Sequence, residues 1–479
     1  MTQQSSSYND SSADQRRLTE LAEGRVGRLL FDYSLPAVVG MLVMSLYNDI
    51  DRIFIGQGVG ADAIAGLAIT FPVMNLSTAL GVLIGVGASA RVSILLGAGN
   101  HAGAERVLGT SLTLILLIAT VYISIFAWKL DDILVAFGAS EATLPYAHDF
   151  MYYLLPGMLM MNISYSFNNI MRGSGYPGRA MFTMFIGAGC NLVLAPIFIF
   201  WLDMGIRGAA IATDISMAIS AYFVMHHFWR KDVTLRFHRG TFRPQWGVVL
   251  SIISIGAAPS LVNAAQCIIN IILNRALYES GGDHAIAAAG IFTTYASLLT
   301  MTVLGICQGM QPIVGYNYGA HRYDRLKRAY MLATAASTVI CVGGGLFGMT
   351  GGGIIARAFT TDADLIDITA DAFSKTFLAF GVVGFQIVTT NFFMSVGKAG
   401  RSIVLSLSRQ VLFLIPLLMV MPPLWGLDGV WYAFPVSDLF ATLVTAILVV
   451  GFFYNLNRTA AARRLQPDFE ILKNDNPTT

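Results

Sequence analysis

The feature that most constrains this chain is a series of apolar runs, each long enough to cross a lipid bilayer. A helical span needs about 20 predominantly apolar residues, and the chain is 55% hydrophobic over 479 residues. Charged residues make up only 12%, about half of the ~25% typical of soluble domains. Twelve runs are long enough, near 30–55, 63–88, 107–128, 147–171, 180–202, 208–228, 248–277, 285–313, 329–349, 371–394, 402–424 and 429–454. The sequence therefore predicts an all-α integral membrane protein with twelve transmembrane helices.

The positive charges are distributed unevenly about these spans. If the amino terminus lies in the cytoplasm and the spans alternate, 24 of the 30 Lys and Arg residues fall on the cytoplasmic side. The positive-inside rule describes this bias, which favours an even number of spans with both termini in the cytoplasm. The expected location is the bacterial plasma (inner) membrane. The formal net charge is only +2, and no basic block alternates with aromatic residues. We therefore expect the lipid bilayer as a partner and no nucleic acid.

The two halves of the chain resemble each other. When the sequence is shifted by roughly 223 residues, Pro36 aligns with Pro259. Further matches in the same order are GSGYPGR (173–179) with SVGKAGR (395–401) and MGIRG (204–208) with WGLDG (425–429). Because each unit contains six spans, both units enter the membrane in the same sense. We therefore predict two six-helix lobes related by a pseudo-two-fold axis along the membrane normal, with a central cleft between them.

The repeat also sets the predicted domain organisation. The chain begins with a polar stretch that lacks the apolar core of a signal peptide, and a basic stretch joins the two lobes. The predicted segments are a disordered cytoplasmic tail at 1–28, an N-lobe at 29–228, a cytoplasmic linker at 229–247, a C-lobe at 248–454 and a second cytoplasmic tail at 455–479. We expect the chain to act as a monomer.

The first span carries two carboxyl groups near its outer end, in the stretch LYNDIDRIFIG. On a helix Asp49 and Asp51 point about 200° apart, so they cannot share one partner. Asp49 lies three residues from Arg52 and is suited to an interfacial ion pair. Asp51 shares a face with Met44 and Tyr47, which suits a lined cavity. Because an acid in the hydrocarbon region costs about 2.5–3.5 kcal/mol, we interpret Asp51 as a functional group that exchanges a proton for another positive charge.

At these residues the chain resembles a known family. LPAVVGMLVMSLYNDIDRIFIG resembles the first helix of the multidrug and toxic compound extrusion (MATE) family, in which an early proline precedes an acid by fifteen residues, as Pro36 precedes Asp51. GVGASARVSILLGAGN (85–100), MRGSGYPGRAMF (171–182) and GIRGAAIAT (205–213) resemble the end of its second helix, its fourth loop and its sixth helix. The resemblance implies efflux of drugs and other organic cations against inward H⁺ or Na⁺, by alternating access and without a cofactor.

The resemblance also implies a cation site in the N-lobe. In archaeal and related bacterial members the site uses an aspartate of helix one, an asparagine of helix five and a threonine of helix six, which match Asp51, Asn191 and Thr213. The aromatic residue one turn before the acid matches Tyr47, and a polar residue of helix four matches Asn168. The implied occupant is a proton or a transient Na⁺, and no permanently bound metal is implied.

Two departures from the family bear on the coupling ion. The family commonly has N-x-x-x-D-P in helix five, whereas this chain reads NLVLAP, with Ala195 in place of the acid. Because a hard cation prefers several oxygen ligands, this loss weakens the case for Na⁺. Asp214, next to Thr213, either compensates for the loss or pairs elsewhere. The helix-seven acid of the Na⁺-coupled branch is also absent, with Gln266 near that position. We therefore favour protons, and the branch that contains the archaeal and DNA-damage-inducible members.

Polar residues of helix seven are candidates for the cargo cavity. They recur at spacings of three and four and so lie on one face of a helix. The predicted substrate cavity comprises Met44, Tyr47, Asn168, Asn263, Gln266 and Asn270.

Two rival functions are weighed against a multidrug exporter. A flippase for a lipid-linked precursor is the alternative transporter, but such proteins often keep a basic cavity, and Lys and Arg are nearly absent from the middle of these spans. An enzyme is disfavoured because the sequence contains neither H-E-x-x-H nor a phosphate-binding loop. The four cysteines lie in apolar runs without a C-x-x-C pair, so they predict neither a disulfide framework nor a metal site.

Overall fold

The computed structural model describes residues 19–59, 61–141, 143–230, 233–238, 240–242 and 244–464. Within its helices, the side chains at 47–49, 51–53, 56–58, 61–65, 267 and 459–464 are outside the description. The described chain is built of helices, because lipid offers the backbone no hydrogen-bond partners and a helix satisfies its own amide and carbonyl groups.

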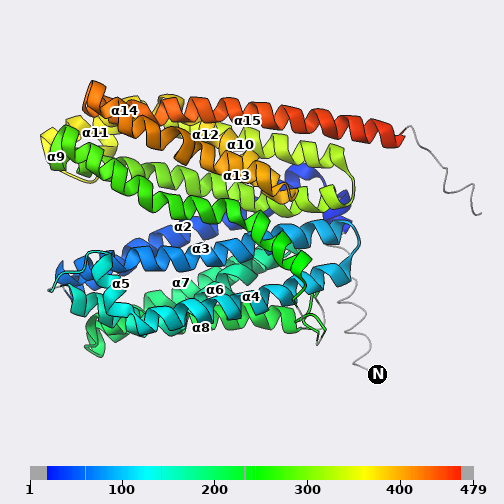
Figure 1. Cartoon of the computed structure of the whole chain (residues 1–479), viewed down its shortest axis with the longest axis horizontal. Helices are drawn as coiled ribbons and strands as arrows, with labels where there is room; N and C mark the ends of the chain where they lie inside the picture. Colours follow the sequence, from blue (N-terminus) through cyan, green and yellow to red (C-terminus); the bar gives the residue numbers. More distant parts are fainter. Residues whose placement is uncertain are drawn as a thin grey trace, which may run out of the picture.

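The helices form two lobes, the lower and upper halves of Figure 1. The lower lobe, which we call the N-lobe, contains α2 (Val26–Gly58), α3 (Ala61–Gly97), α4 (His101–Trp128), α5 (Leu130–Ala136), α6 (Leu144–Gly173), α7 (Pro177–Pro196), the π-helix η1 (Ile197–Trp201) and α8 (Gly205–Trp229). The upper lobe, the C-lobe, contains α9 (Trp246–Gly319), α10 (Tyr323–Arg357), α11 (Ala363–Thr376), the 3₁₀ turn η2 (Phe377–Ala379), α12 (Phe380–Ser395), α13 (Ala399–Leu407), the π-helix η3 (Ser408–Leu414), α14 (Ile415–Trp425) and α15 (Leu427–Arg464).

The helix α9 accounts for two crossings. Its 74 residues would extend about 110 Å as a straight helix, against a hydrocarbon core of about 30 Å. It breaks at Gly282, where φ is 64° and ψ is −156°, a conformation that glycine adopts without a side-chain clash. Ten described helices have the length and apolarity of a membrane span, with α9 counted once. With both limbs of α9 and with α6, which is 30 residues long and buries several asparagines, the described residues form the twelve predicted crossings.

The helices extend past the predicted spans. For example, α10 covers Tyr323–Arg357, whereas its apolar run covers only 329–349. Hydropathy detects the part of a helix that lies in hydrocarbon, while the backbone hydrogen bonds continue into the polar interface. The short helix α5 has no apolar run of its own and was not predicted.

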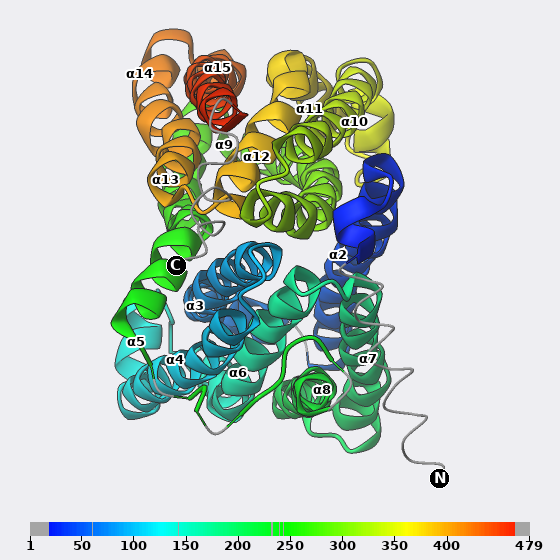
Figure 2. The same cartoon turned by 90° about the vertical axis from the view of Figure 1, so that its right-hand side faces the viewer.

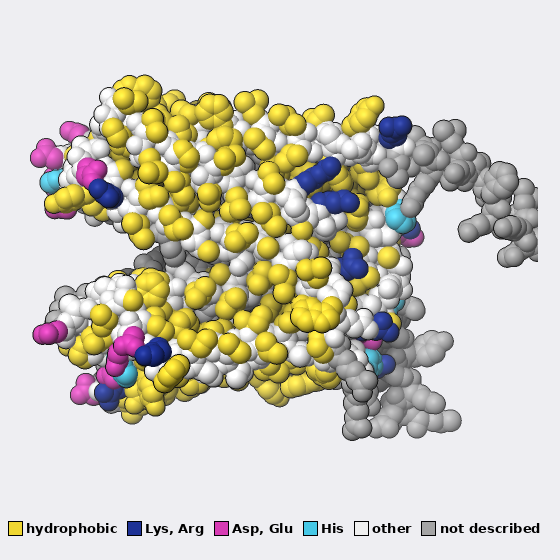
Figure 3. Space-filling model, in the orientation of Figure 1, with side chains coloured by type: hydrophobic (Ala, Val, Ile, Leu, Met, Phe, Trp, Pro, Cys, Tyr) yellow, Lys and Arg dark blue, Asp and Glu magenta, His cyan; other side chains and the backbone are white. Residues whose placement is uncertain are grey.

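Apolar side chains cover the outside of both lobes. Trp201, Leu412 and Ile447 are among the large apolar residues that are exposed. Figure 3 shows hydrophobic side chains across most of the visible face, while most charged side chains gather at its two ends. A continuous apolar surface of this kind matches lipid rather than water. The chain is therefore a multi-pass membrane protein.

The lobes meet at one end and separate at the other. We call the end where α2 begins and α15 ends the terminal face, and the opposite end the distal face (Figure 1). Figure 3 shows a hollow between the lobes that opens at the distal face and closes toward the terminal face. The structure thus has the predicted cleft in a state that is open at one end only.

Glycines close the terminal face. A Cβ atom on Gly97 of α3 would lie 1.9 Å from the carbonyl oxygen of Tyr316, and one on Gly319 of α9 would lie 2.0 Å from that of Ile94. Gly97 and Gly319 occupy corresponding positions of the repeat, and so do Ile94 and Tyr316. We call this reciprocal contact the glycine crossing. Only residues without a side chain let the two backbones approach so closely.

The start of α2 packs against the C-lobe, although most of α2 belongs to the N-lobe. Leu21 and Val26 are buried among C-lobe residues. Arg325 of α10 donates from Nη2 to the carbonyl oxygens of Gly24 at 2.7 Å and Leu21 at 3.2 Å, and Arg322 donates to that of Ala22 at 2.6 Å. Residues 19–28 therefore differ from the disordered tail that the sequence predicted. A single leucine in a polar segment carries no hydropathy signal, because its burial depends on partners some 300 residues away.

Candidate functional site

Asn191 and Thr213 meet in the N-lobe, where α7 packs against α8. Asn191 donates from Nδ2 to Thr213 Oγ1 at 3.0 Å, and Thr213 donates its hydroxyl proton to the carbonyl oxygen of Ala209 at 3.0 Å. Asn191 is 1% exposed. A hydroxyl oxygen has two acceptor lone pairs, so Thr213 keeps one after accepting from Asn191. The structure therefore joins two residues of the implied cation site.

The position of the missing acid is apolar. Ala195 lies one turn beyond Asn191, is fully buried and belongs to an apolar cluster that includes Ile55 and Ile199. Pro196 follows it, and η1 begins directly after this proline. Because proline lacks an N–H group and its ring displaces a carbonyl of the preceding turn, the helix widens here. At position 195, where the family commonly has a carboxyl group, the face of α7 that carries Asn191 therefore presents only an apolar side chain.

Asp214 points to a different helix from Thr213. Its Oδ2 accepts a hydrogen bond from the backbone N–H of Gly157 in α6 at 3.1 Å. Its Oδ1 is buried and has no hydrogen-bond partner among the described residues. A Cβ atom on residue 157 would lie 1.7 Å from this Oδ1, so the contact requires glycine. Consecutive helical residues diverge by about 100°, and Asp214 accordingly lies apart from the contact between Asn191 and Thr213.

The side chains of Asp51 and Tyr47 lie outside the described residues. Their backbone belongs to α2, which is helical through this region. Ile55, one turn after Asp51, is fully buried in the same apolar cluster as Ala195. Asp51 is thus one helical turn from Ile55, which belongs to the same apolar cluster as Ala195 of α7.

The side chain of Asn168 forms its hydrogen bonds within the N-lobe. It is 5% exposed, and its Nδ2 donates to the carbonyl oxygen of Ala180 at 2.6 Å and to Thr183 Oγ1 at 2.7 Å. This amide therefore joins the terminal half of α6 to the start of α7. It forms no hydrogen bond with Asn191 or Thr213 in the part of the chain that the structure describes, and its buried side chain offers little surface to a cargo.

The three helix-seven candidates lie on the first limb of α9, which borders the gap between the lobes in Figure 1. Asn263 is half-buried, whereas Gln266 and Asn270 are exposed. Gln266 donates from Nε2 to Asn270 Oδ1 at 3.1 Å. Amides exposed to hydrocarbon would be costly, so this geometry suits a helix face that borders the hollow between the lobes. Met44 of α2 is half-buried.

A second polar cluster of the N-lobe was not predicted. Asn162 of α6 donates from Nδ2 to Ser77 Oγ of α3, to the hydroxyl oxygen of Tyr122 of α4 and to the carbonyl oxygen of Met158, each at 2.8 Å. Ser77 and Tyr122 also share a hydrogen bond at 2.8 Å. The asparagine in an apolar run was the available signal, but its partners lie on helices whose contacts the sequence does not show.

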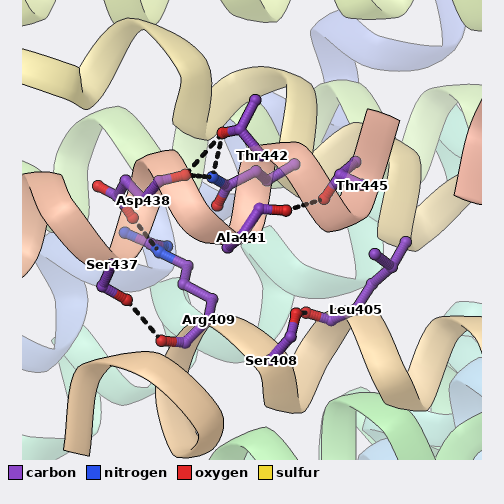
Figure 4. A network of polar contacts seen from close by, with 9 residues as sticks. Leu405, Ser408, Arg409, Ser437, Asp438, Ala441, Thr442 and Thr445 are labelled. Atoms are coloured by element: carbon purple, nitrogen blue, oxygen red, sulfur yellow. Dashed lines mark hydrogen bonds and ion pairs between the residues drawn. The ribbon is translucent and has the colours of Figure 1, made fainter. Parts of the chain in front are cut away.

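The C-lobe contains a buried ion pair. Arg409 of η3 donates from Nε to Asp438 Oδ1 of α15 at 2.7 Å, as Figure 4 shows. The side chain of Asp438 is 4% exposed and that of Arg409 is 29% exposed. Arg409 is one of the 24 Lys and Arg residues that the sequence pattern places on the cytoplasmic side, and its position inside the span Ala399–Trp425 corrects that assignment. A count of charges does not see that an acid from another helix neutralises the arginine.

Side chains around the pair satisfy the backbone. Ser437 donates to the carbonyl oxygen of Arg409 at 2.7 Å, and Thr442 donates to that of Asp438 at 2.6 Å (Figure 4). Gln386 of α12 donates from Nε2 to the same carbonyl oxygen of Asp438 and to Thr442 Oγ1. The π-helical turn at Arg409 shifts the backbone pairing from the regular helical pattern, and the Ser437 hydroxyl provides a partner from the neighbouring helix.

Comparisons with known proteins agree with this architecture. The sequence profile of the MatE family matches residues 36–197 and 259–420, so the two matches begin at the aligned prolines and confirm the repeat. Multidrug export protein MepA of Staphylococcus aureus (strain MSSA476) is 26% identical over 433 residues, which cover 88% of this chain and 93% of that protein. MepA of Staphylococcus haemolyticus (strain JCSC1435) is 26% identical and covers 91% and 94%.

A solved structure shows the same arrangement. The outward-facing conformation of a multidrug resistance MATE family transporter of the MOP superfamily has a TM-score of 0.86 and 26% identity, over 92% of this chain and 98% of that chain. The two profile matches together span more than half of the sequence. The chain is a member of the MatE family of transporters.

Proposed function

We propose that this protein is a multidrug efflux antiporter, which exports organic cations and other toxic compounds in exchange for inward H⁺ or Na⁺. The observation that carries the proposal is the match over nearly the whole chain to multidrug export proteins, together with a hollow that opens at one face only. The curated relatives named above are multidrug export proteins, which favours export over the flippase alternative.

The proposed orientation places the terminal face in the cytoplasm of a bacterial cell and the protein in the plasma membrane. When the spans are taken to alternate, 24 of the 30 Lys and Arg residues fall on the same side as the amino terminus, which is the cytoplasmic side by the positive-inside rule. The structure then corresponds to an outward-open state, in which the glycine crossing separates the hollow from the cytoplasm. Alternating access requires this crossing to part while the distal ends of the lobes close.

The proposed coupling site is Asp51 with Asn191 and Thr213. The contact of Asn191 with Thr213 supports it, because the two residues that the family resemblance assigns to one site are hydrogen-bonded, with Asn191 buried and Thr213 half-buried. Residues one turn apart share a helix face, so we expect Asp51 on the same side of α2 as Ile55, which packs beside Ala195. Cargo and coupling ion would then compete for the negative charge of Asp51.

We propose protons as the coupling ion. Ala195 removes a carboxyl group, and Asp214 uses one oxygen on Gly157 of α6, so fewer oxygens remain near Asn191 for Na⁺, which prefers several. The unpartnered Oδ1 of Asp214 makes this residue a second candidate to carry a proton in the N-lobe.

The decisive experiment uses purified protein in lipid vesicles, with an organic cation dye as cargo. A pH gradient alone is compared with a Na⁺ gradient alone. We expect the pH gradient to drive dye transport in the wild type, and Asp51→Asn to abolish it, because an amide cannot exchange a proton at neutral pH.

The matched control is Asp49→Asn, two residues away on the opposite side of the same helix, which should keep transport. Wild-type rates in folded Asp51→Asn protein would refute the coupling site. If neither the pH gradient nor the Na⁺ gradient moves any organic cation through the wild type, the antiport itself is refuted.

A further inference from the structure

The ion pair between Arg409 and Asp438 lies inside the C-lobe, between spans that are otherwise mostly apolar. Replacing a buried ion pair by apolar residues often leaves a protein equally or more stable, because removing two charges from water opposes their attraction. Charged residues within membrane spans are rare and usually mark the path of an ion or a substrate. Stability alone is therefore a weak explanation for this pair.

The same crossing of helices exists in the N-lobe without a charged residue at either of the two corresponding positions. By the alignments of the repeat, Arg409 corresponds to Gly187 and Asp438 to Met217. A Cβ atom on Gly187 would lie 3.3 Å from Cβ of Ser220, so α7 and α8 pack closely at this level. The fifth and sixth spans of a lobe can therefore cross without an ion pair, and the charges are specific to the C-lobe.

The amide of Gln386 packs against the backbone of Asp438 and leaves one of its own atoms without a hydrogen bond among the described residues. Gln386 is 5% exposed, and it donates two hydrogen bonds from Nε2. Its Oε1 is buried and lacks a partner in the part of the chain that the structure describes. The hydroxyl of Thr442 accepts from the same Nε2 and donates to the backbone carbonyl oxygen of Asp438. The carboxyl group of Asp438 is bonded to Arg409. Amide, hydroxyl and carboxylate oxygens are the groups that bind small hard cations.

Arg409 is placed so that its charged end can leave. Its backbone is held by Ser437, whereas its side chain remains 29% exposed. The titratable groups near Asp438 are Arg409 from η3 and Cys341 from α10, while α12 contributes the neutral Gln386. Arg409 thus provides the positive charge at Asp438 in this state.

We propose that Asp438 is a second cation-exchange site of this transporter, which Arg409 fills as a tethered cation in the distally open state. When the guanidinium group leaves, a small monovalent cation, H⁺ or Na⁺, takes its place at the carboxyl group of Asp438. The inference rests on the proposed antiport but not on coupling at Asp51.

The test measures thermal unfolding of purified Arg409→Gln protein in detergent, across pH and across Na⁺ at constant ionic strength. Removing the tethered cation leaves Asp438 to recruit a free one. The melting temperature should therefore rise with Na⁺ if Na⁺ is the occupant, or with falling pH if the proton is. The double variant Arg409→Gln/Asp438→Asn should show neither rise.

Arg207→Gln is the matched control. Arg207 makes the same kind of bond, from Nε to Asp149 at 2.8 Å, but both side chains are exposed to 53% and 31%. Its loss leaves a carboxyl group that water can solvate, so we expect no new dependence of the melting temperature on Na⁺ or pH.

Transport in vesicles provides the second readout. Arg409→Lys keeps a tethered cation and should keep gradient-driven efflux, whereas Asp438→Asn and the neutral double variant should lose it while remaining folded. If Arg409→Gln yields no folded protein, Asp438→Glu is compared with Asp438→Asn, and only the carboxylate should keep efflux.

Two results would overturn the inference and would mean that the ion pair between Arg409 and Asp438 has a structural role only. One is a cation response of Arg409→Gln that equals that of the double variant. The other is wild-type efflux by the neutral double variant. Either result, obtained with Asp51→Asn still inactive, would leave the proposed antiport intact.

Discussion

Gly157 lets the carboxyl group of Asp214 reach the backbone of α6. The distance of 1.7 Å between a Cβ atom at this position and Asp214 Oδ1 shows that no side chain fits here. Gly81 likewise makes room for the side chain of Asn162, because a Cβ atom on residue 81 would lie 2.6 Å from Asn162 Oδ1. At the scale of residues, the N-lobe thus hosts polar groups where glycines of neighbouring helices make room.

This leads to a prediction for Gly157→Ala. The added methyl group must displace Asp214 and separate α6 from α8, and overpacking of this kind costs about 1–3 kcal/mol. The melting temperature of the purified protein should fall. Gly189→Ala is the control, because nothing lies within 4 Å of a Cβ atom there. Equal melting temperatures for the two variants would contradict the contact between Gly157 and Asp214.

Ala195→Asp tests the coupling ion. An added carboxyl group one turn from Asn191 restores an oxygen ligand, so efflux of a dye should become more dependent on Na⁺ than in the wild type. Ala195→Asn, which adds a similar volume without charge, is the control. An unchanged Na⁺ dependence in folded Ala195→Asp protein would show that position 195 does not reach the bound cation.

At the scale of elements, irregular helical turns place the polar groups. The turn η1 follows Pro196, and η3 precedes Pro416 and carries Arg409. Prolines in membrane helices release backbone groups that neighbouring helices satisfy, and π-turns often occur at functional sites. Between the lobes, the glycine crossing has a similar local effect, because it brings the backbones of α3 and α9 into contact at the terminal face.

The glycine crossing yields a prediction for Gly319→Ala. A methyl group there would lie 2.0 Å from the backbone carbonyl oxygen of Ile94, so the terminal face should be forced apart. Spin labels at His101 and His321, both exposed, should report longer distances by double electron–electron resonance. Gly400→Ala, where a Cβ atom meets nothing within 4 Å, should leave them unchanged. Unaltered distances in Gly319→Ala would mean that this contact does not hold the lobes together.

At the scale of the whole molecule, one helix belongs to both lobes. The start of α2 is buried against the C-lobe, while Ile55 near its other end is buried in the N-lobe. Figure 2 shows α2 between the two groups of helices. A change in the angle between the lobes must therefore bend or tilt the helix that carries Asp51.

Arg325→Gln tests this link. Arg325 donates to Leu21, Gly24 and Asn317, and hydrogen bonds from a charged group contribute about 1.5–3 kcal/mol each. Amides of 19–25 should exchange hydrogen faster in the variant, as mass spectrometry would show. Arg328→Gln, which alters an exposed neighbour, is the control. Equal exchange in both variants would contradict a tie between this segment and the C-lobe.

The sequence by itself was sufficient for the spans, the repeat and the family. Apolar length is a local property, and the shift that aligns Pro36 with Pro259 needs no knowledge of contacts. The pairing of Asn191 with Thr213 also agrees with the family resemblance. The orientation of the termini, the coupling ion, the branch within the family and the role of Asp51 remain predictions.

Only the tertiary structure decided which distant residues meet. It placed Asp214 on Gly157 rather than beside Asn191, and it joined Arg409 to Asp438. It also tied the start of α2 to the opposite lobe through Arg325. The physical reason is that helix packing sets the rotation and depth of each span, and a rotation of 100° moves a carboxyl group from one neighbour to another. Hydropathy is the same for every such rotation, so the sequence pattern could not choose among them.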